Sequence, residues 1–264
     1  MAKRFSQKKM DDMAEQMHAA VESLNVVKVQ ELLASGVDPD VWGITVDYDR
    51  PLQAVARREG DDALAIAKAL IEAGAEIDYQ GDYNCTALAR AVDTEDPEGE
   101  DWAMARYLLK AGANPSLYDR DGLTPAEYAN SNGLDDAVLA MLEAGMDPNV
   151  RGIAGPLIWY MAYASPAIIK ALLARGVDPD SKAYGLGCNG QTPLFRAAES
   201  LSEGGLDEDD FLEIAIALIQ AGADPAQIEP APECLAAFLL SRTEKDDFSD
   251  LPPGITDPNP RGSL

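Results

Sequence analysis

A glycine-centred pattern recurs along this chain, and it limits the possible folds more than any other feature of the sequence. Each copy has an aliphatic segment before the glycine, and an apolar residue followed by an acidic or amide residue after it. A glycine in this position takes the left-handed conformation and ends a helix without Cβ strain. The glycines are Gly36, Gly74, Gly112, Gly145, Gly176 and Gly222, separated by 38, 38, 33, 31 and 46 residues. This spacing predicts a repeat protein.

A second pattern opens each repeat and predicts the start of another helix. A threonine can cap a helix, and a proline at the first helical position loses no needed hydrogen bond. The copies are Arg50-Pro51-Leu52, Thr86-Ala87-Leu88, Thr124-Pro125-Ala126, Gly155-Pro156-Leu157 and Thr192-Pro193-Leu194. Upstream of them, apolar spacing predicts helices over residues 9–23 and 26–35. Each repeat is therefore expected to be a pair of helices, with a longer loop leading to the next pair.

The two patterns together resemble the ankyrin-repeat family, whose repeats of about 33 residues carry a T-P-L-H-x-A pattern. No copy keeps the histidine of that pattern. Its place is taken by Gln53, Ala89, Glu127, Ile158 and Phe195. The resemblance covers roughly residues 10–240, about six repeats plus a cap. It implies an all-α fold, an ankyrin-repeat solenoid of antiparallel helix pairs with finger loops between the repeats.

The same resemblance suggests how the chain is organised. We expect one array over residues 1–242, with an N-terminal capping repeat at about 9–38 and a C-terminal cap at about 229–242. Residues 243–264 are acidic and rich in Pro and Gly, which is typical of an irregular tail. Insertions lengthen two fingers, at 41–49 and 181–190, and two connections inside repeats, at 93–101 and 201–210. Insertions in such arrays fall in loops, often on the binding side.

The net charge of −25, from 46 acidic and 21 basic residues, bears on the partner. It disfavours nucleic acid and anionic membranes, because phosphate groups would be repelled. It favours a basic protein partner, although acidity that serves solubility alone is the alternative. No apolar run approaches membrane-spanning length, and no secretory signal is visible at the N-terminus. Three widely separated cysteines suggest no disulfide framework and favour a reducing compartment, the cytoplasm.

Catalysis is not expected, and we predict no catalytic residue, no cofactor and no metal. The single histidine, His18, has no nucleophile motif beside it and is expected on the surface. The acidic clusters at 93–101 and 207–210 lack the ordered ligand spacing of a calcium loop. Residues 185–190 contain spaced glycines, but no predicted strand precedes them, so a flexible turn is favoured over a nucleotide site.

Partner-binding residues are predicted from their places in the repeats. In ankyrin proteins the finger tips and the inner faces of the first helices form the binding surface. Aromatic residues in or beside the fingers would be anchors there, unless they pack beneath the enlarged loops; they are Trp42, Tyr48, Tyr83 and Tyr184. Positions that vary with partner in the family are occupied here by Asp82, Arg120, Asp121, Asn189 and Glu199.

Bulky residues at 159–163 depart most from the family pattern, which has small alanines there. Either they fill a gap between splayed helices, or Trp159 and Tyr163 form a contact patch. Trp102, by contrast, is predicted to be part of the core.

The resulting hypothesis is a non-enzymatic protein-binding module with an acidic surface. One specific form of it is an immunity protein, an inhibitor that neutralises a bacterial toxin whose active site is basic. The alternatives are a general scaffold or effector with several partners, and a metal-dependent module that uses the acidic loops. The sequence leaves the identity of the partner and the oligomeric state open.

Overall fold

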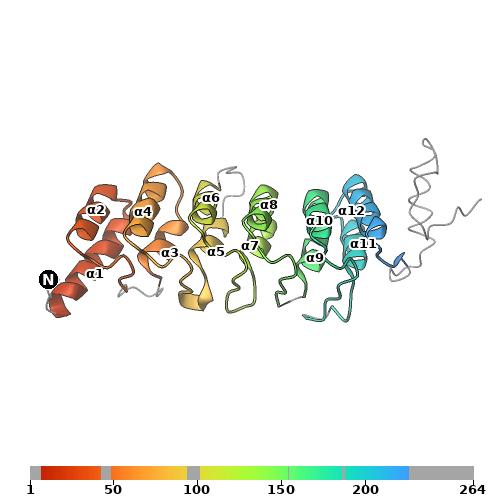
Figure 1. The fold of residues 1–264 in the computed structure, drawn as a ribbon, viewed down its shortest axis with the longest axis horizontal. Coiled ribbons are helices and arrows are strands. Elements are labelled where there is room, and N and C mark those ends of the chain that lie inside the picture. The colour runs from red at the N-terminus through yellow and green to blue at the C-terminus, as the bar shows by residue number, and fades with distance from the viewer. Residues whose placement is uncertain (1–6, 43–48, 94–101, 154, 186–187, 226–264) are drawn as a thin grey trace, which may run out of the picture. The chain divides into compact units, whose positions relative to one another are not determined.

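The computed structural model describes residues 7–42, 49–93, 102–153, 155–185 and 188–225 (Figure 1). Within these ranges the regular elements are helices, and the only extended pairing is two isolated β-bridges in loops. The chain divides into two compact units, Met1–Asp147 and Pro148–Leu264. The prediction of an all-α fold is confirmed.

The first unit contains four successive pairs of helices in its described part, and a short 3-10 turn. The bounds are α1 (Gln7–Glu22), α2 (Val26–Ala34), α3 (Pro51–Ala56), α4 (Asp61–Glu72), η1 (Asp82–Asn84), α5 (Ala87–Val92), α6 (Ala103–Lys110), α7 (Pro125–Ser131) and α8 (Asp135–Glu143). The first helix of each pair packs against the first helix of the next, and the second helices do the same. Within this unit, Figure 1 shows the first helices on the side of the long connecting loops. The pairs are therefore stacked in two layers.

The second unit repeats this arrangement with two pairs in its described part. The bounds are α9 (Leu157–Tyr160), η2 (Met161–Tyr163), α10 (Pro166–Leu173), α11 (Pro193–Glu203) and α12 (Glu208–Gln220). Helix α10 packs against α12, and α9 with η2 packs against α11. The predicted C-terminal cap at 229–242 and the tail at 243–264 lie outside the described residues.

Helix ends follow the local signals predicted from the sequence. The side chains of Thr86, Thr124 and Thr192 each accept a hydrogen bond from the backbone N–H three residues later. At Thr124 the cap is reciprocal, because Glu127 in turn accepts from the Thr124 N–H. At the other ends, the turn glycines adopt positive φ, for example +97° at Gly112. The predicted threonine caps at the starts of these helices and the glycine turns are confirmed.

The first helix of the second unit differs from the predicted pattern. Pro156 is the residue that precedes α9, and the helix is only four residues long before it tightens into η2. Trp159 and Met161 are buried at this point. Bulky side chains therefore occupy the positions where the family pattern has alanines, and the helix is short and irregular where they pack.

Backbone hydrogen bonds to side chains fix the register between neighbouring repeats. An acceptor four residues after one turn glycine binds the amide two residues after the next turn glycine, at 2.8 to 3.2 Å. The bonds join Asp40 to the amide of Glu76, Asp78 to that of Asn114, Ser116 to that of Asp147, and Asp180 to that of Asp224. This ladder sets the spacing at which adjacent loops leave the helices.

The described helices include none that is both long enough and apolar enough to cross a membrane.

Candidate binding surface on the finger loops

The loops that join successive helix pairs form the candidate site, and we call them fingers. In the first unit, finger 1 spans residues 37–50, finger 2 spans 75–86 and finger 3 spans 113–124. In the second unit, finger 4 spans 148–156 and finger 5 spans 177–192. In its described part each finger exposes one large apolar side chain; these are Trp42, Tyr83, Tyr118, Ile153 and Tyr184. A large aromatic side chain that remains exposed on a monomer is a common anchor for a protein partner.

In finger 1 the exposed ring of Trp42 lies near the guanidinium of Arg50. Trp42 is 54% exposed, and its ring meets that of Tyr79 edge-on, with centroids 6.0 Å apart. The guanidinium carbon of Arg50 lies 3.4 Å from the Tyr79 ring centre and 5.8 Å from the Trp42 ring centre. Both distances are within the range of cation–π attraction. Trp42 is therefore an exposed ring with a fixed orientation.

Two carboxylates pair with Arg50, and His18 forms a hydrogen bond with the backbone of the same loop. An Nη1 of Arg50 lies 2.9 Å from Glu76 and 3.4 Å from Asp40. His18 is only 5% exposed, and its Nε2 bonds the carbonyl oxygen of Val41 at 3.1 Å. The expectation that His18 lies on the surface is wrong. Finger 1 and the helices packed on α1 cover it, a contact between residues far apart in sequence.

Fingers 2 and 3 are tied to each other by their backbones. The Arg120 N–H donates to the Tyr83 carbonyl at 2.6 Å. The Gln80 side-chain amide donates to the carbonyls of Tyr118, at 2.8 Å, and Asn84, at 3.2 Å. Two exposed tyrosines, Tyr83 at 54% and Tyr118 at 58%, are thereby held on adjacent loops.

Buried Asp119 organises finger 3 from within. Its carboxylate accepts from the backbone N–H groups of Asp121 and Leu123, and from the hydroxyl of Tyr128 at 2.5 Å. The thiol of Cys85, also buried, lies 4.0 Å from the same carboxylate. Because Asp119 is turned inward, the residues that flank it, Tyr118 and Arg120, are turned outward and exposed.

The pKa values of two groups around Asp119, the Tyr128 hydroxyl and the Cys85 thiol, are raised. Burial raises the pKa of the Tyr128 hydroxyl strongly, and the hydrogen bond to Asp119 adds to the effect. Burial is also the main reason why the pKa of the Cys85 thiol is raised, and nearby Arg90 opposes it only in part. Both groups therefore stay protonated at neutral pH. Neither is a reactive nucleophile in this environment, because nucleophilic attack by sulfur needs the thiolate.

In the second unit, Arg196 brings together three residues that the sequence analysis selected. Its guanidinium carbon lies 5.5 Å from the Trp159 ring centre and 4.9 Å from that of Tyr163, and an Nη1 bonds Glu199 at 2.8 Å. Trp159 is only 6% exposed and packs with Ala183 and Cys188 beneath finger 5. Of this group, Tyr163 and Glu199 are half-buried and reach the surface.

Finger 5 exposes Tyr184 more than any other large apolar residue among those described, at 70%. A bridge between Ala183 and Gln191 closes the base of the loop. The ring of Tyr184 lies against Gly190, and Asn189 beside it is exposed with a positive φ of 41°. Finger 5 is therefore a closed hairpin with an aromatic residue at its surface.

Two of the predicted site residues cannot be placed in this surface. Tyr48 lies outside the described residues. Asp82 is described only by its backbone, in η1.

Sequence reasoning missed other residues of the surface, namely Tyr118, Ile153, Arg50 and Arg196. A signal for two of them was present. Tyr118 follows Gly112 by six residues, as Trp42 follows Gly36, and Ile153 follows Gly145 by eight, as Tyr184 follows Gly176.

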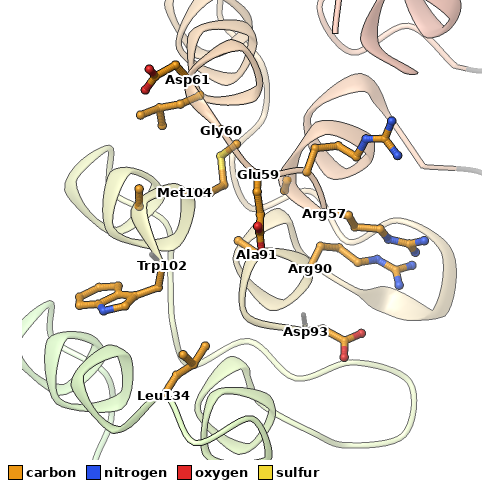
Figure 2. A pocket seen from close by; sticks show the side chains of 14 residues that line it. Arg57, Glu59, Gly60, Asp61, Arg90, Ala91, Asp93, Trp102, Met104 and Leu134 are labelled. Atoms are coloured by element: carbon orange, nitrogen blue, oxygen red, sulfur yellow. The ribbon is translucent and has the colours of Figure 1, made fainter. Parts of the chain in front are cut away.

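A pocket in the first unit lies at the C-terminal ends of α3 and α5 and is lined by residues outside the fingers. Figure 2 shows Arg57 and Arg90 extending to the same side, with Trp102 and Leu134 on the other. Its charged lining residues are Arg57, Arg58, Arg90, Glu59, Asp61 and Asp93. Arg57 and Arg90 both pair with buried Asp49, at 3.2 and 3.5 Å. The arginines are balanced by acids, so the pocket has no excess charge that would select an ion.

Acidic residues at the start of α12 have a structural role. The Asp207 side chain accepts from the Asp210 N–H at 2.8 Å and caps the helix, which begins at Glu208. Among the residues that the structure describes, no three His, Cys, Asp or Glu side chains come together as a metal site would need.

Comparisons with known proteins agree with this architecture. No family model matches the chain. The nuclear factor NF-kappa-B p105 subunit of Gallus gallus is 28% identical over 257 residues, covering 78% of this chain and 25% of that protein. The chain therefore spans about a quarter of the length of this relative.

Two solved structures are similar in fold. The ankyrin repeat domain of Bcl-3 has a TM-score of 0.61 at 21% identity, covering 82% of this chain and 91% of that one. EF0377, an ankyrin repeat protein, has a TM-score of 0.60 at 22% identity, covering 78% and 98%. At these identities the likeness is one of fold.

Proposed function

We propose that this chain, which is an ankyrin-repeat protein, binds a protein partner along its fingers, with Trp42, Tyr83 and Tyr118 as the anchors in the first unit. Ankyrin repeats are generally protein-binding modules. The observation that carries the proposal is the regular exposure of one large apolar side chain on each finger. Residues that fill a core would not recur at the surface of successive loops.

The way these rings are held supports a role in binding. Trp42 is oriented by Arg50 and Tyr79, and the loops of Tyr83 and Tyr118 are joined by one backbone hydrogen bond and one from the Gln80 side chain. Side chains that are already ordered lose little conformational entropy when a partner binds. Such preorganised aromatic residues are the usual hot spots of interfaces.

The charge of the chain indicates the kind of partner. A net charge of −25 attracts a basic protein over long range and repels nucleic acid. We therefore propose a basic partner, and as a specific form of this proposal an inhibitor that covers a basic active site, such as that of a bacterial toxin. A scaffold with several weak partners is the competing interpretation.

The experiment is affinity capture from the source cells with the full chain, compared with a Trp42→Ala/Tyr83→Ala/Tyr118→Ala variant. The matched control is Val27→Ala/Ile216→Ala, which removes exposed apolar side chains from α2 and α12, away from the fingers. We expect one dominant basic protein that the finger variant loses and the control retains. Its association rate should fall as salt is raised, because screening weakens attraction between exposed charges.

Capture that is equal for all three proteins would contradict binding through the fingers. Several weakly held proteins in place of one would support the scaffold interpretation. If one partner is found, an assay of its own activity with and without this chain tests whether binding inhibits it.

A further inference from the structure

We infer that the adjoining tips of fingers 2 and 3 form a recognition site for a carboxylate that the partner presents beside a large apolar side chain. The residues that form it are Tyr83, Tyr118 and Arg120. This inference rests on the proposed function, since it names the chemistry that one part of the finger surface accepts.

The two tips behave as one surface because they are joined twice. The Arg120 N–H donates to the Tyr83 carbonyl, and Gln80 reaches across to the Tyr118 carbonyl. Asp119, between Tyr118 and Arg120, is buried and bonded to its own loop and to Tyr128. The three exposed side chains thus project from a backbone that is held in place from below.

Tyr83 lies in a tight turn, in which the Asn84 N–H donates to the Gly81 carbonyl at 3.1 Å and Asn84 is also left-handed. Its φ of 56° and ψ of 19° lie in the left-handed region, which is unfavourable for a bulky residue. Glycine would adopt this conformation without strain. The ring is 54% exposed, so core packing offsets little of the cost. The turn therefore places the Tyr83 ring at the surface of finger 2.

Arg120 determines which chemical group of the partner the site binds. Its guanidinium lies 5.8 Å from the Tyr83 ring centre, the residue is exposed, and it forms no ion pair with any side chain that the structure describes. Asp121 follows it and is exposed, but the two are not paired. A guanidinium binds a carboxylate through two parallel hydrogen bonds, and the neighbouring tyrosine rings can take an apolar group.

The sign of this contact is opposite to that of the chain as a whole. The net negative charge attracts a basic partner over long range. A carboxylate of that partner is repelled by most of the surface and can bind closely only beside a cation such as Arg120. A single contact of opposite sign therefore selects the register in which the partner docks, which is the usual role of paired charges at an interface.

The test uses a displayed library of random peptides panned against the full chain, followed by affinities of the enriched synthetic peptides. We expect the enriched peptides to share an Asp or Glu close to an aromatic residue or leucine. Arg120→Ala should weaken their binding by about tenfold or more, as expected for loss of a hydrogen bond to a charged group. Arg175→Ala removes an exposed arginine whose side chain, among the described residues, bonds only the Ala171 carbonyl of the preceding helix, so it should leave the affinity unchanged.

A second variant separates binding from folding. Tyr83→Gly relieves the left-handed backbone strain, so it should unfold at a higher urea concentration while binding the peptides more weakly. Lower stability together with unchanged affinity would overturn the inference. So would the absence of enriched peptides, enriched peptides that lack a carboxylate, or an Arg120→Ala affinity equal to that of the wild type. Capture of a partner by a Trp42→Ala single variant tests the proposed function separately, because Trp42 is not part of this site.

Discussion

The guanidinium carbon of Arg50 lies 3.4 Å from the centre of the Tyr79 ring, although the two residues belong to different fingers. The same guanidinium pairs with Glu76 and Asp40 and lies beneath Trp42. One arginine therefore links the first two fingers by stacking and by charge. Lysine would preserve the charge but not the planar stacking surface or the forked donors.

We predict that Arg50→Lys lowers the free energy of unfolding by about 1 kcal/mol, through lost stacking and lost hydrogen bonds. Arg50→Ala should cost more, about 2 kcal/mol, because the ion pairs are lost as well. Urea unfolding followed by circular dichroism measures both. Arg175→Lys is the control, because among the described residues the Arg175 side chain bonds only the Ala171 carbonyl of the preceding helix α10. Equal stability of wild type and Arg50→Lys would show that the stacking contributes nothing.

In the second unit, Gly155 approaches Ala183 too closely for any other residue. A Cβ on Gly155 would lie 2.6 Å from the Ala183 Cβ and 2.8 Å from its Cα, and its φ is +152°. We predict that Gly155→Ala destabilises this unit by about 2 to 4 kcal/mol, from overpacking and backbone strain together.

Gly176→Ala is the matched control for that substitution. Gly176 also has a positive φ, of +79°, but a Cβ there would meet nothing within 4 Å. It should cost only the backbone strain, about 1 kcal/mol. Equal costs in the two variants, measured as the shift in urea midpoint, would show that fingers 4 and 5 do not approach as closely as described.

The hydroxyl of Tyr128 donates to the buried carboxylate of Asp119, and we predict that this bond stabilises finger 3. Tyr128→Phe should lower the free energy of unfolding by about 1.5 to 3 kcal/mol, the usual value for a hydrogen bond to a charged group. Tyr118→Phe is the control, because that side chain is largely exposed. Thermal or urea unfolding of the two variants measures the difference in their stability. No loss in Tyr128→Phe would mean that Asp119 is held adequately by the backbone amides alone.

Glu127 gives the pH dependence of stability a definite sign. It is almost completely buried, and burial raises its pKa above the ordinary 4.5, although hydrogen bonds from Thr124 oppose the shift. The folded protein therefore holds this proton more tightly than the unfolded chain. It follows that burying the charged form costs stability at neutral pH, and that this cost disappears as pH falls through the raised pKa towards 4.5.

Glu127→Gln keeps the acceptor for the Thr124 amide and removes the buried charge. We predict that the stability of Glu127→Gln relative to wild type is highest at neutral pH and declines as the solution is acidified towards the ordinary pKa. Glu127→Ala, which also loses the cap, should cost about 1 kcal/mol or more. Urea unfolding at a series of pH values measures the difference. A gap that widens on acidification would mean that the folded-state pKa is lowered.

With α9 as the exception, the sequence by itself determined the helix pairs, their ends and the turns between them. These features depend on neighbours in the chain: a threonine that caps its own helix at Thr124 or Thr192, or a glycine that ends one at Gly112. Local signals of this kind act over a few residues, so they are legible without any tertiary contact. The repetition of both signals also identified the stacked architecture.

Only the tertiary structure decided which aromatic residues reach the surface and how they are held. Trp42 and Trp159 are both bulky residues at unusual positions, yet one is exposed and the other lies beneath Ala183 and Cys188. His18 is buried because finger 1 folds back onto it. Exposure depends on contacts between residues that are distant in the chain, and the insertions in the fingers create contacts that the repeat pattern does not specify. Local sequence therefore predicts the elements, whereas packing between repeats decides the surface that a partner meets.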